Sequence, residues 1–210
     1  MHPNPIYRPE GRERDIAFAR ARGFGVLTVA AGDAAPMVSH LPFILSADGT
    51  RLEGHVVRSN PIARALRDGP RAARMVVSGP DAFISPDWYG VEDQVPTWNY
   101  IAVHLAGRVE LAPPGGLRDH LSRLSETFEA QLAPKPIWRL DKVSPDALEK
   151  LERMILPVAL LVTDIESTWK LTQNKTEAAR LGAADGVAGG TPGQELAALV
   201  ALMREPPVAS

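Results

Sequence analysis

Apolar and polar residues alternate along several short stretches of the chain, and turn-forming residues separate these stretches. Such alternation predicts β-strands. We expect strands over residues 24–31, 36–45, 51–57, 71–78, 82–85, 97–111, 158–165 and 169–171. In the longest stretch, 97–111, the odd positions carry the apolar side chains of a core face. Because tight turns such as Asp48-Gly49 join neighbouring strands, an antiparallel barrel is favoured over a parallel α/β sheet.

Helical periodicity and capping residues predict helices between and after these strands. The expected ranges are 10–22, 61–68, 117–132, 145–155 and 194–204. Asn60 suits the N-cap of the second helix, and Pro61 suits its first position, where the missing N–H costs nothing. The segment 174–177 resembles a capping box and predicts one more helix, which ends at Gly182.

Short strands joined by tight turns, with helices added, are typical of a small barrel with helical decoration. We therefore expect a mainly β fold with α-helices, in the α+β class. One domain is expected over residues 1–182, with a helical insertion at about 115–156. The Gly- and Ala-rich residues that follow predict a flexible segment and a C-terminal helix over 183–210.

Charge and composition narrow the range of partners. Lys and Arg total 23 and Asp and Glu total 25, so the basic excess of a typical stand-alone nucleic-acid-binding protein is missing. The sequence contains no cysteine, which excludes disulfides and thiolate metal ligands. It also has no apolar stretch of membrane-spanning length and no signal-peptide pattern. We expect a soluble, cytoplasmic protein with no membrane partner.

One candidate binding segment is Gly54–Pro61, where a predicted strand runs into a helix start. Unpaired N–H groups at such a start suit a phosphate, and Arg58 adds charge and a planar fork of donors. Ser59 and Asn60 stand at the same junction. Spacing alone favours the simpler alternative, in which Asn60 caps the helix and Arg58 is solvated.

Three further segments carry aromatic and polar side chains. Residues 79–89 include three aromatics, which suit a planar ligand, a subunit interface or a hydrophobic corner under a loop. In the next segment, Thr97 and Asn99 lie on the strand face opposite Trp98. Near the end of the last strand, Lys170 and Gln173 supply donors, whereas the simpler interpretation of nearby Asn174 is a helix cap.

Catalytic and metal motifs are not visible in the sequence. His40, His55 and His104 lie on predicted strands, but no short spacing of histidines supports a metal site. No Ser-His-Asp set, phosphate-binding loop or dinucleotide-binding glycine pattern occurs. We therefore expect no metal, and we assign no catalytic residue.

In their order along the chain, these segments resemble the PaiB family. The matching stretches are Ser39–Phe43, Gly54–Pro61, Ile84–Tyr89, Pro96–His104 and Lys170–Asn174. They extend over residues 1 to about 182, and the pieces Pro-Thr-Trp-Asn-Tyr and Ser-Pro-Asp-Trp-Tyr are uncommon.

The resemblance implies a split β-barrel of the pyridoxamine-phosphate-oxidase-like, FMN-binding type, usually a homodimer with flavin at the subunit interface. By that likeness the segment from His55 to Asn60 holds the phosphate, with Arg58 as its main charge. Thr97, Trp98 and Asn99 lie near the flavin from the partner strand. The full set of implied FMN-binding residues is His40, His55, Arg58, Ser59, Asn60, Thr97, Trp98, Asn99, Lys170 and Gln173.

Members of the PaiB family are described as FMN-binding negative regulators of transcription, so a flavin-binding regulator is the first functional hypothesis. DNA binding remains part of this hypothesis, although the net charge of the chain does not support it. The alternative is a flavin-dependent oxidoreductase that acts on a small molecule, because flavin carries its own redox chemistry. A third interpretation, a barrel that binds haem or another tetrapyrrole, rests only on the strand histidines.

Overall fold

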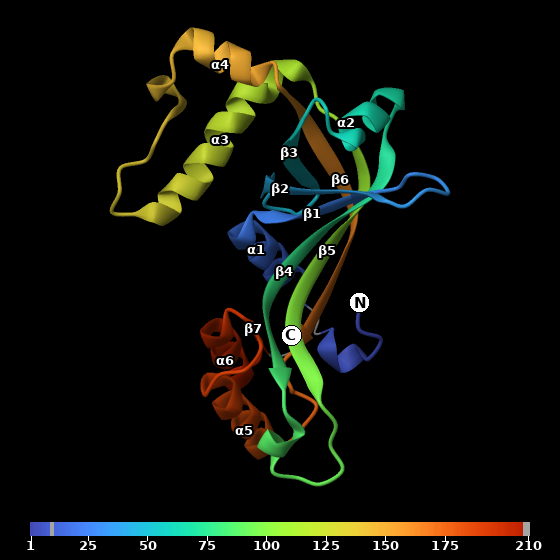
Figure 1. Ribbon diagram of the computed structural model, residues 1–210, viewed down its shortest axis with the longest axis vertical. Coiled ribbons are helices and arrows are strands. Elements are labelled where there is room, and N and C mark those ends of the chain that lie inside the picture. Colours follow the sequence, from blue (N-terminus) through green and yellow to red (C-terminus); the bar gives the residue numbers. More distant parts are fainter. Residues whose placement is uncertain (9–10, 208–210) are drawn as a thin grey trace. The chain divides into compact units, whose positions relative to one another are not determined.

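The computed structural model describes residues 1–8 and 11–207 (Figure 1). Its strands are β1 (Phe24–Val29), β2 (Met37–Leu45), β3 (Arg51–Val57), β4 (Arg71–Ile84), β5 (Thr97–Leu111), β6 (Ile155–Lys170) and β7 (Gly193–Gln194). Its α-helices are α1 (Arg12–Arg22), α2 (Pro61–Ala65), α3 (Leu117–Glu129), α4 (Pro145–Glu152), α5 (Glu177–Ala188) and α6 (Leu196–Arg204). Short 3-10 turns include η1 (Pro5–Tyr7) and η3 (Pro86–Tyr89).

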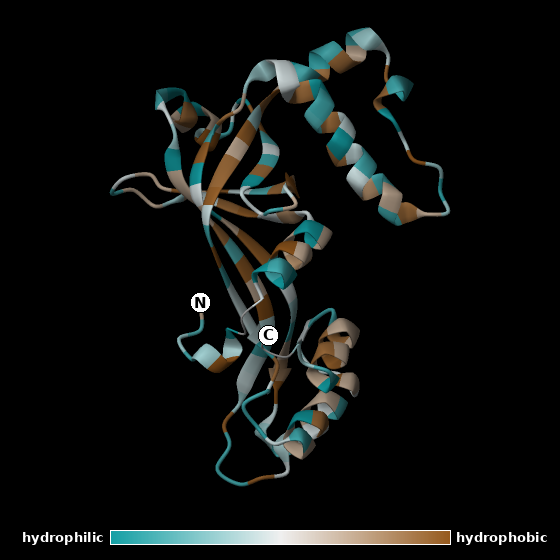
Figure 2. Cartoon of the chain, turned by 180° about the vertical axis from the view of Figure 1, so that it is seen from behind, coloured by the Kyte–Doolittle hydropathy of each residue, from teal (hydrophilic) through white to brown (hydrophobic). Residues whose placement is uncertain are grey.

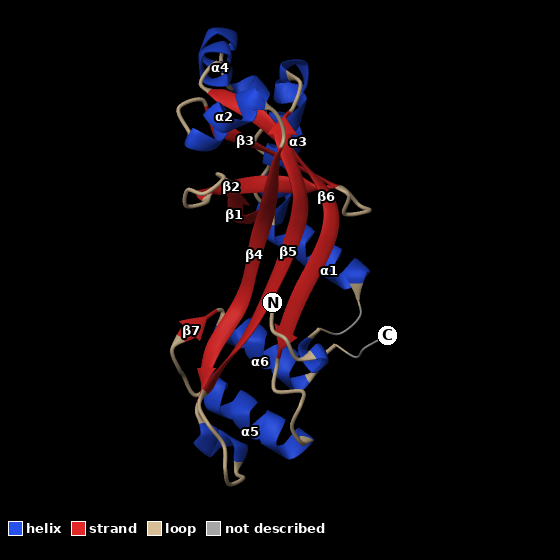
Figure 3. Cartoon of the chain, turned by 90° about the vertical axis from the view of Figure 1, so that its right-hand side faces the viewer, coloured by secondary structure: helices blue, strands red, loops and turns tan. Residues whose placement is uncertain are grey.

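The chain forms two compact units. The first, here called the barrel unit, comprises Ile16–Val76 and Leu105–Asp164. The second, here called the terminal unit, comprises Met1–Asp15, Val77–His104 and Ile165–Ser210. Strands β4, β5 and β6 each contribute residues to both units (Figure 3).

The barrel unit is a closed antiparallel barrel. The strand order is β1-β2-β3-β6-β5-β4, and pairing of β1 with β4 closes the ring. Alternate side chains of these strands fill the interior, where Leu27, Phe43, Leu52, Met75 and Leu105 are almost completely buried. Helix α3 carries hydrophobic and hydrophilic residues on different faces, as the sequence pattern predicts (Figure 2). The expected α+β barrel with flanking helices is confirmed.

Gly107 on β5 shows how closely the barrel strands approach one another. A Cβ at this position would lie 1.9 Å from the carbonyl oxygen of Leu161 on β6. No side chain fits that distance, so glycine is required at this point of the barrel.

In the terminal unit, β7 pairs with β4 through Asp81 and Ala82, and α5 packs against η3. The five-membered ring of the Trp88 indole lies where a Cβ of Gly186 would be, at 2.1 Å. Leu199 and Met203 of α6 and Ala183 and Ala184 of α5 are fully buried. Small residues on α5 thus allow the close approach of η3.

The structure corrects several predicted element boundaries. The two strands expected over 71–78 and 82–85 are one strand, β4, which continues through Gly79 and Pro80. Likewise 158–165 and 169–171 belong to the single strand β6, whose polar residues Ser167 and Thr168 are buried and therefore do not interrupt it. Helix α4 ends at Glu152 because the chain enters β6 at Ile155.

The helix expected to stop at Gly182 continues to Ala188. Gly182 and Gly186 serve packing against Trp88 rather than helix termination, because a Cβ on Gly182 would lie 2.5 Å from the Trp88 carbonyl oxygen. The predicted domain boundary at residue 182 therefore falls inside α5. The cap of this helix is Thr176, whose hydroxyl accepts from the Ala179 N–H at 3.3 Å, and not Asn174.

Among the described residues, the structure contains no helix with the length and apolar character of a membrane span.

Candidate functional site

A pocket of about 180 Å³ in the terminal unit gathers several of the predicted site residues. Its walls include Tyr7, Tyr89, Thr97, Asn99, Lys170 and Thr172. They come from η1, η3, the start of β5, and the end of β6 with the turn that follows it. Three of the residues implied by the family resemblance, Thr97, Asn99 and Lys170, therefore meet at one pocket.

Lys170 is held in place at the pocket wall by a hydrogen bond. Its ammonium donates to the Thr97 hydroxyl at 2.5 Å and lies 5.7 Å from the centre of the Tyr7 ring. Burial lowers the pKa of Lys170. The result is a partly desolvated cation, positioned by a neutral hydroxyl and paired with no carboxylate among the described residues.

Asn99 on β5 presents a buried oxygen without a partner. The residue has no exposed surface, and its amide nitrogen donates to the Thr172 hydroxyl at 2.7 Å and contacts Met203 Sδ at 3.5 Å. Among the described residues, nothing hydrogen-bonds to Asn99 Oδ1. Buried acceptors are normally paired, so this atom is the best marker of an interaction with a ligand.

Backbone strain coincides with the same pocket. Thr172 adopts a φ of 65° and Asp93 a φ of 59°, and both residues line the pocket. The left-handed region is unfavourable for a β-branched residue such as threonine, and such conformations cluster at functional sites. In the case of Thr172, the strained turn brings the hydroxyl to Asn99.

Cations and aromatic rings set the electrostatics of the pocket. Lys175 hydrogen-bonds to Gln94 and lies 4.6 Å from the centre of the Tyr89 ring. Burial raises the pKa of both Tyr7 and Tyr89, so both phenols are neutral at physiological pH. The charged residues of the pocket wall are Lys170, Lys175 and Asp93, so the formal net charge of the wall is positive.

Two other predicted residues of this unit have different roles. Gln173 accepts from the Leu171 N–H at 2.7 Å and donates to the Trp169 carbonyl at 2.5 Å, so its side chain holds the turn after β6. Trp98 points away from the wall formed by Thr97 and Asn99, is 45% exposed, and meets Phe83 edge to face at 6.3 Å. It belongs to the surface of the unit and not to the pocket lining.

The remaining predicted residues lie in the barrel unit. Arg58 is exposed and uses Nε to donate to the Arg153 carbonyl at 2.5 Å, which leaves its two terminal nitrogens without a partner among the described residues. Asn60 caps α2 by accepting from the Ile62 N–H at 2.9 Å, and its amide nitrogen donates to Ser39 Oγ at 3.1 Å. Asn60 therefore stabilises the turn from β3 into α2, here called the corner, whereas Arg58 and the exposed Ser59 remain available to a ligand.

The two predicted strand histidines of the barrel unit have different environments. His40 is exposed on β2, where its ring lies 6.5 Å from that of Phe24. His55 Nδ1 lies 3.3 Å from Nε2 of His120, a buried residue of α3. Only Nε2 of His55 is left for a ligand.

Sequence reasoning assigned no role in the pocket to Tyr7, Thr172 or Lys175. Tyr7 precedes the other wall residues by more than eighty positions, so no local pattern connects them. For Thr172, the strain that marks it is visible only in the backbone. Lys175 is part of the predicted capping box, and this sequence signal points to helix initiation rather than to a ligand.

The donor and acceptor set fits parts of a phosphorylated flavin. An unpaired acceptor at Asn99 and a cation at Lys170 match the donor and carbonyl groups along the edge of a flavin ring. The open guanidinium fork of Arg58 matches a phosphate.

Comparison with known proteins gives the family. Residues 1–164 match the family described as "Putative FMN-binding domain". The chain is 33% identical over 180 residues to "Protease synthase and sporulation protein PAI 2" of Bacillus subtilis (strain 168), covering 84% of each chain. It is also 23% identical over 206 residues to an uncharacterised protein of Emericella nidulans, covering 80% of this chain and 82% of that one.

Solved structures show the fold. An FAD- and heme-binding protein from Mycobacterium smegmatis is similar with a TM-score of 0.58 at 17% identity, covering 89% of this chain and 82% of that one. The flavocytochrome Anf3 from Azotobacter vinelandii is similar with a TM-score of 0.55 at 14% identity, covering 81% and 72%. At these identities the likeness establishes the shared barrel and no shared activity.

Proposed function

Since the chain belongs to the FMN-binding family that it matches over residues 1–164, we propose that the terminal-unit pocket receives the flavin ring edge and that Arg58 binds the phosphate. The observation that carries this proposal is the convergence of Thr97, Asn99 and Lys170 on one pocket with an unpaired buried acceptor. FMN, when bound, supplies redox chemistry that the side chains of the protein do not have.

At the ring edge, Asn99 and Lys170 have complementary tasks. Asn99 Oδ1 accepts a hydrogen bond from a ring N–H, and the Lys170 ammonium donates to a ring carbonyl. The Thr97 hydroxyl and the partly desolvated surroundings keep Lys170 in one position, so little side-chain entropy is lost on binding.

At the phosphate, Arg58 is the main charge. Its hydrogen bond to the Arg153 carbonyl fixes the guanidinium plane and leaves the terminal nitrogens for two parallel hydrogen bonds to phosphate oxygens. Ser59 is placed to add a hydroxyl donor. Asn60 acts by shaping the corner.

We also propose a homodimer. Trp98, Val91 and Val95 in the terminal unit are 45%, 52% and 74% exposed. Exposed tryptophan and other apolar side chains are typical of subunit interfaces. In a homodimer, the phosphate-binding corner and the ring-edge pocket of one site can come from different copies of the chain.

For the cellular role, we favour a flavin-binding regulator of the PaiB type over a flavin-dependent oxidoreductase. Among the described residues that line the terminal-unit pocket, the titratable groups are Asp93, two tyrosines with raised pKa and two lysines, and no histidine is present to act as an acid or base near neutral pH. The relative from Bacillus subtilis is named for protease synthesis and sporulation, which is consistent with a regulatory role.

Two assays on the FMN-loaded protein separate these roles. Steady-state oxidation of a reduced nicotinamide by the holoprotein would support the oxidoreductase. A salt-dependent gel shift of promoter fragments from its own genome, but not of unrelated fragments of equal length, would support the regulator. A regulator that acts through a protein partner would give neither signal, and DNA binding would then be excluded.

A further inference from the structure

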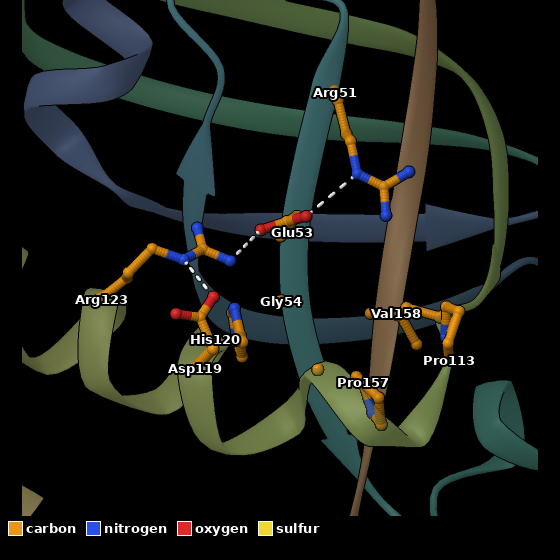
Figure 4. Close-up of a pocket in the computed structure, with 11 residues that line it drawn as sticks. Arg51, Glu53, Gly54, Pro113, Asp119, His120, Arg123, Pro157 and Val158 are labelled. Atoms are coloured by element: carbon orange, nitrogen blue, oxygen red, sulfur yellow. Dashed lines mark hydrogen bonds and ion pairs between the residues drawn. The ribbon is translucent and has the colours of Figure 1, made fainter.

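A second cavity, of about 250 Å³, lies in the barrel unit (Figure 4). Its walls come from β3, the start of β6, the first turns of α3 and the connection that precedes α3. It shares no lining residue with the terminal-unit pocket, and none of its lining residues belongs to the FMN-binding set implied by the family resemblance.

His120 borders this cavity with an unsatisfied nitrogen. The side chain is 4% exposed, its Nε2 lies 3.3 Å from His55 Nδ1, and its Nδ1 has no hydrogen-bond partner in the part of the chain that the structure describes. Burial, with a smaller effect of His55, lowers the pKa of His120 to about 4, so the ring is neutral at physiological pH. A buried imidazole nitrogen without a partner is a costly feature, and a ligand in the cavity would satisfy it.

Arg51 on β3 is the cation of the cavity with free donors. Its Nε donates to Glu53 Oε1 at 3.0 Å, and its terminal nitrogens have no partner among the described residues. Arg123 is committed instead, because it donates to Glu53 Oε2 and to Asp119, each at 2.7 Å. Both oxygens of Glu53 are thus already bound to arginines, which reduces their repulsion of an anion near Arg51.

The opposite wall is apolar. Ala112, Pro113, Pro157 and Val158 line it, and Figure 4 shows Pro113, Pro157 and Val158 on the side away from His120 and Asp119. A ligand that contacts both walls needs one anionic group and a compact apolar body, because binding pockets usually combine an apolar lining with a few polar groups. An inorganic ion would leave the apolar wall uncovered.

We propose that this cavity is a binding site for a small organic monocarboxylate. The carboxylate lies between the Arg51 fork and His120 and accepts from His120 Nδ1–H, in the tautomer in which His120 Nε2 accepts from His55 Nδ1–H. The apolar body packs against Pro113 and Pro157. The site is distinct from the proposed flavin site. The two are connected through His120, which contacts His55 at the start of the proposed phosphate-binding segment.

Benzoate is a suitable probe, and benzamide is its neutral isostere. In isothermal titration of the full-length protein we expect benzoate to bind with a millimolar or lower Kd and benzamide at least about tenfold more weakly. Replacing Arg51 by glutamine should weaken benzoate binding at least about tenfold. The matched control is Arg67→Gln, which removes an exposed arginine of the same unit outside the cavity and should leave Kd unchanged.

His120 gives a second readout in the unmodified protein. Benzoate should shift the imidazole ¹⁵N resonances of His120 and leave those of the exposed His40 unchanged. Equal binding of benzoate and benzamide, wild-type affinity in the Arg51 variant, or no binding at millimolar benzoate would each overturn the proposal. Competitive loss of benzoate binding on saturation with FMN would assign the cavity to the flavin site and would also overturn it.

Discussion

In the terminal unit, the side-chain amide of Asn99 donates to the Thr172 hydroxyl at 2.7 Å, and its own oxygen has no partner among the described residues. Thr172 adopts a φ of 65° to make this contact. The protein thus holds a buried acceptor in a fixed direction, at a cost in backbone strain, in the pocket that Lys170 also lines. This arrangement supports our proposal that the flavin edge binds at this pocket.

Asn99→Leu should weaken FMN binding by about tenfold, because about 1.4 kcal/mol is the expected contribution of a buried hydrogen bond to the ligand. Thr172→Val is the matched control. It removes the same Asn99–Thr172 hydrogen bond but keeps Asn99 Oδ1 and the branched shape at position 172. Quenching of FMN fluorescence measures both affinities. Equal losses in the two variants would mean that Asn99 acts only through local structure.

Arg58→Ala should weaken FMN binding by roughly 1.5–3 kcal/mol, the range for a hydrogen bond to a charged group. Riboflavin, which lacks the phosphate, should bind the variant and the wild type equally. Arg67→Ala removes another exposed arginine of the same unit and should change neither affinity. If riboflavin loses as much affinity as FMN, Arg58 does not bind the phosphate.

Trp98→Ala should shift the protein toward the monomer, because the 45% exposed indole is the largest of the exposed apolar side chains that the structure describes in the terminal unit. Light scattering coupled to size-exclusion chromatography measures the mass at several loading concentrations. The melting temperature extrapolated to low concentration should stay near the wild-type value, since little of the intramolecular core is lost. An unchanged mass at every concentration would argue against this surface as the interface.

His120 predicts that stability falls on acidification. Burial lowers the pKa of His120 from 6.5 to about 4, so between these values the unfolded chain binds a proton that the folded chain does not. The free energy of unfolding should therefore be highest above pH 6.5 and decrease by up to about 3 kcal/mol as the pH approaches 4. The groups that face His120 are His55 and Glu53 on β3 and Asp119 and Arg123 on its own helix.

Urea unfolding of the FMN-free protein at pH 7.5 and at pH 5 measures this slope. The His120→Gln variant should show a shallower loss of stability between the two values. His40→Gln, which replaces an exposed histidine, should keep the slope of the wild type. A steep slope that survives in the His120 variant would assign the acid sensitivity to other groups.

Gly186→Ala should destabilise the terminal unit by at least about 1–3 kcal/mol, the usual cost of overpacking. The new Cβ would lie 2.1 Å from the Trp88 ring. Gly189→Ala, near the end of the same helix, places its Cβ 3.4 Å from the nearest atom and should be close to neutral. Thermal unfolding followed by tryptophan fluorescence separates the two, and equal melting temperatures would contradict the packing described here.

The sequence predicts the barrel well because its strands obey the alternation rule and its turns carry their own signals. The N-cap at Asn60, for example, is readable from Asn-Pro alone. The predicted breaks inside β4 and β6 are wrong. Gly79-Pro80 resembles a turn, and the polar residues Ser167 and Thr168 resemble the end of a strand. Only tertiary structure reveals that these polar side chains are buried in a continuous strand.

The candidate site is less predictable from sequence. The resemblance to the PaiB family identifies Thr97, Asn99 and Lys170, but spacing alone does not bring Tyr7 to them. The contact of His120 with His55 has a weak sequence signal, since His120 lies three residues after Leu117 and four before Leu124, both of which are buried. A histidine on that apolar stripe indicates a buried imidazole, although its partner on β3 is not readable from the pattern.

Hydrogen–deuterium exchange with and without FMN tests the proposed FMN site most directly. It reports on the phosphate-binding segment and on the terminal-unit pocket at once, in the unmodified protein. Saturating FMN should slow exchange in peptides that cover residues 55–62, 93–100 and 170–176. Riboflavin should protect the last two segments and leave 55–62 unchanged. Protection by FMN that is confined to other parts of the chain would contradict the assignment.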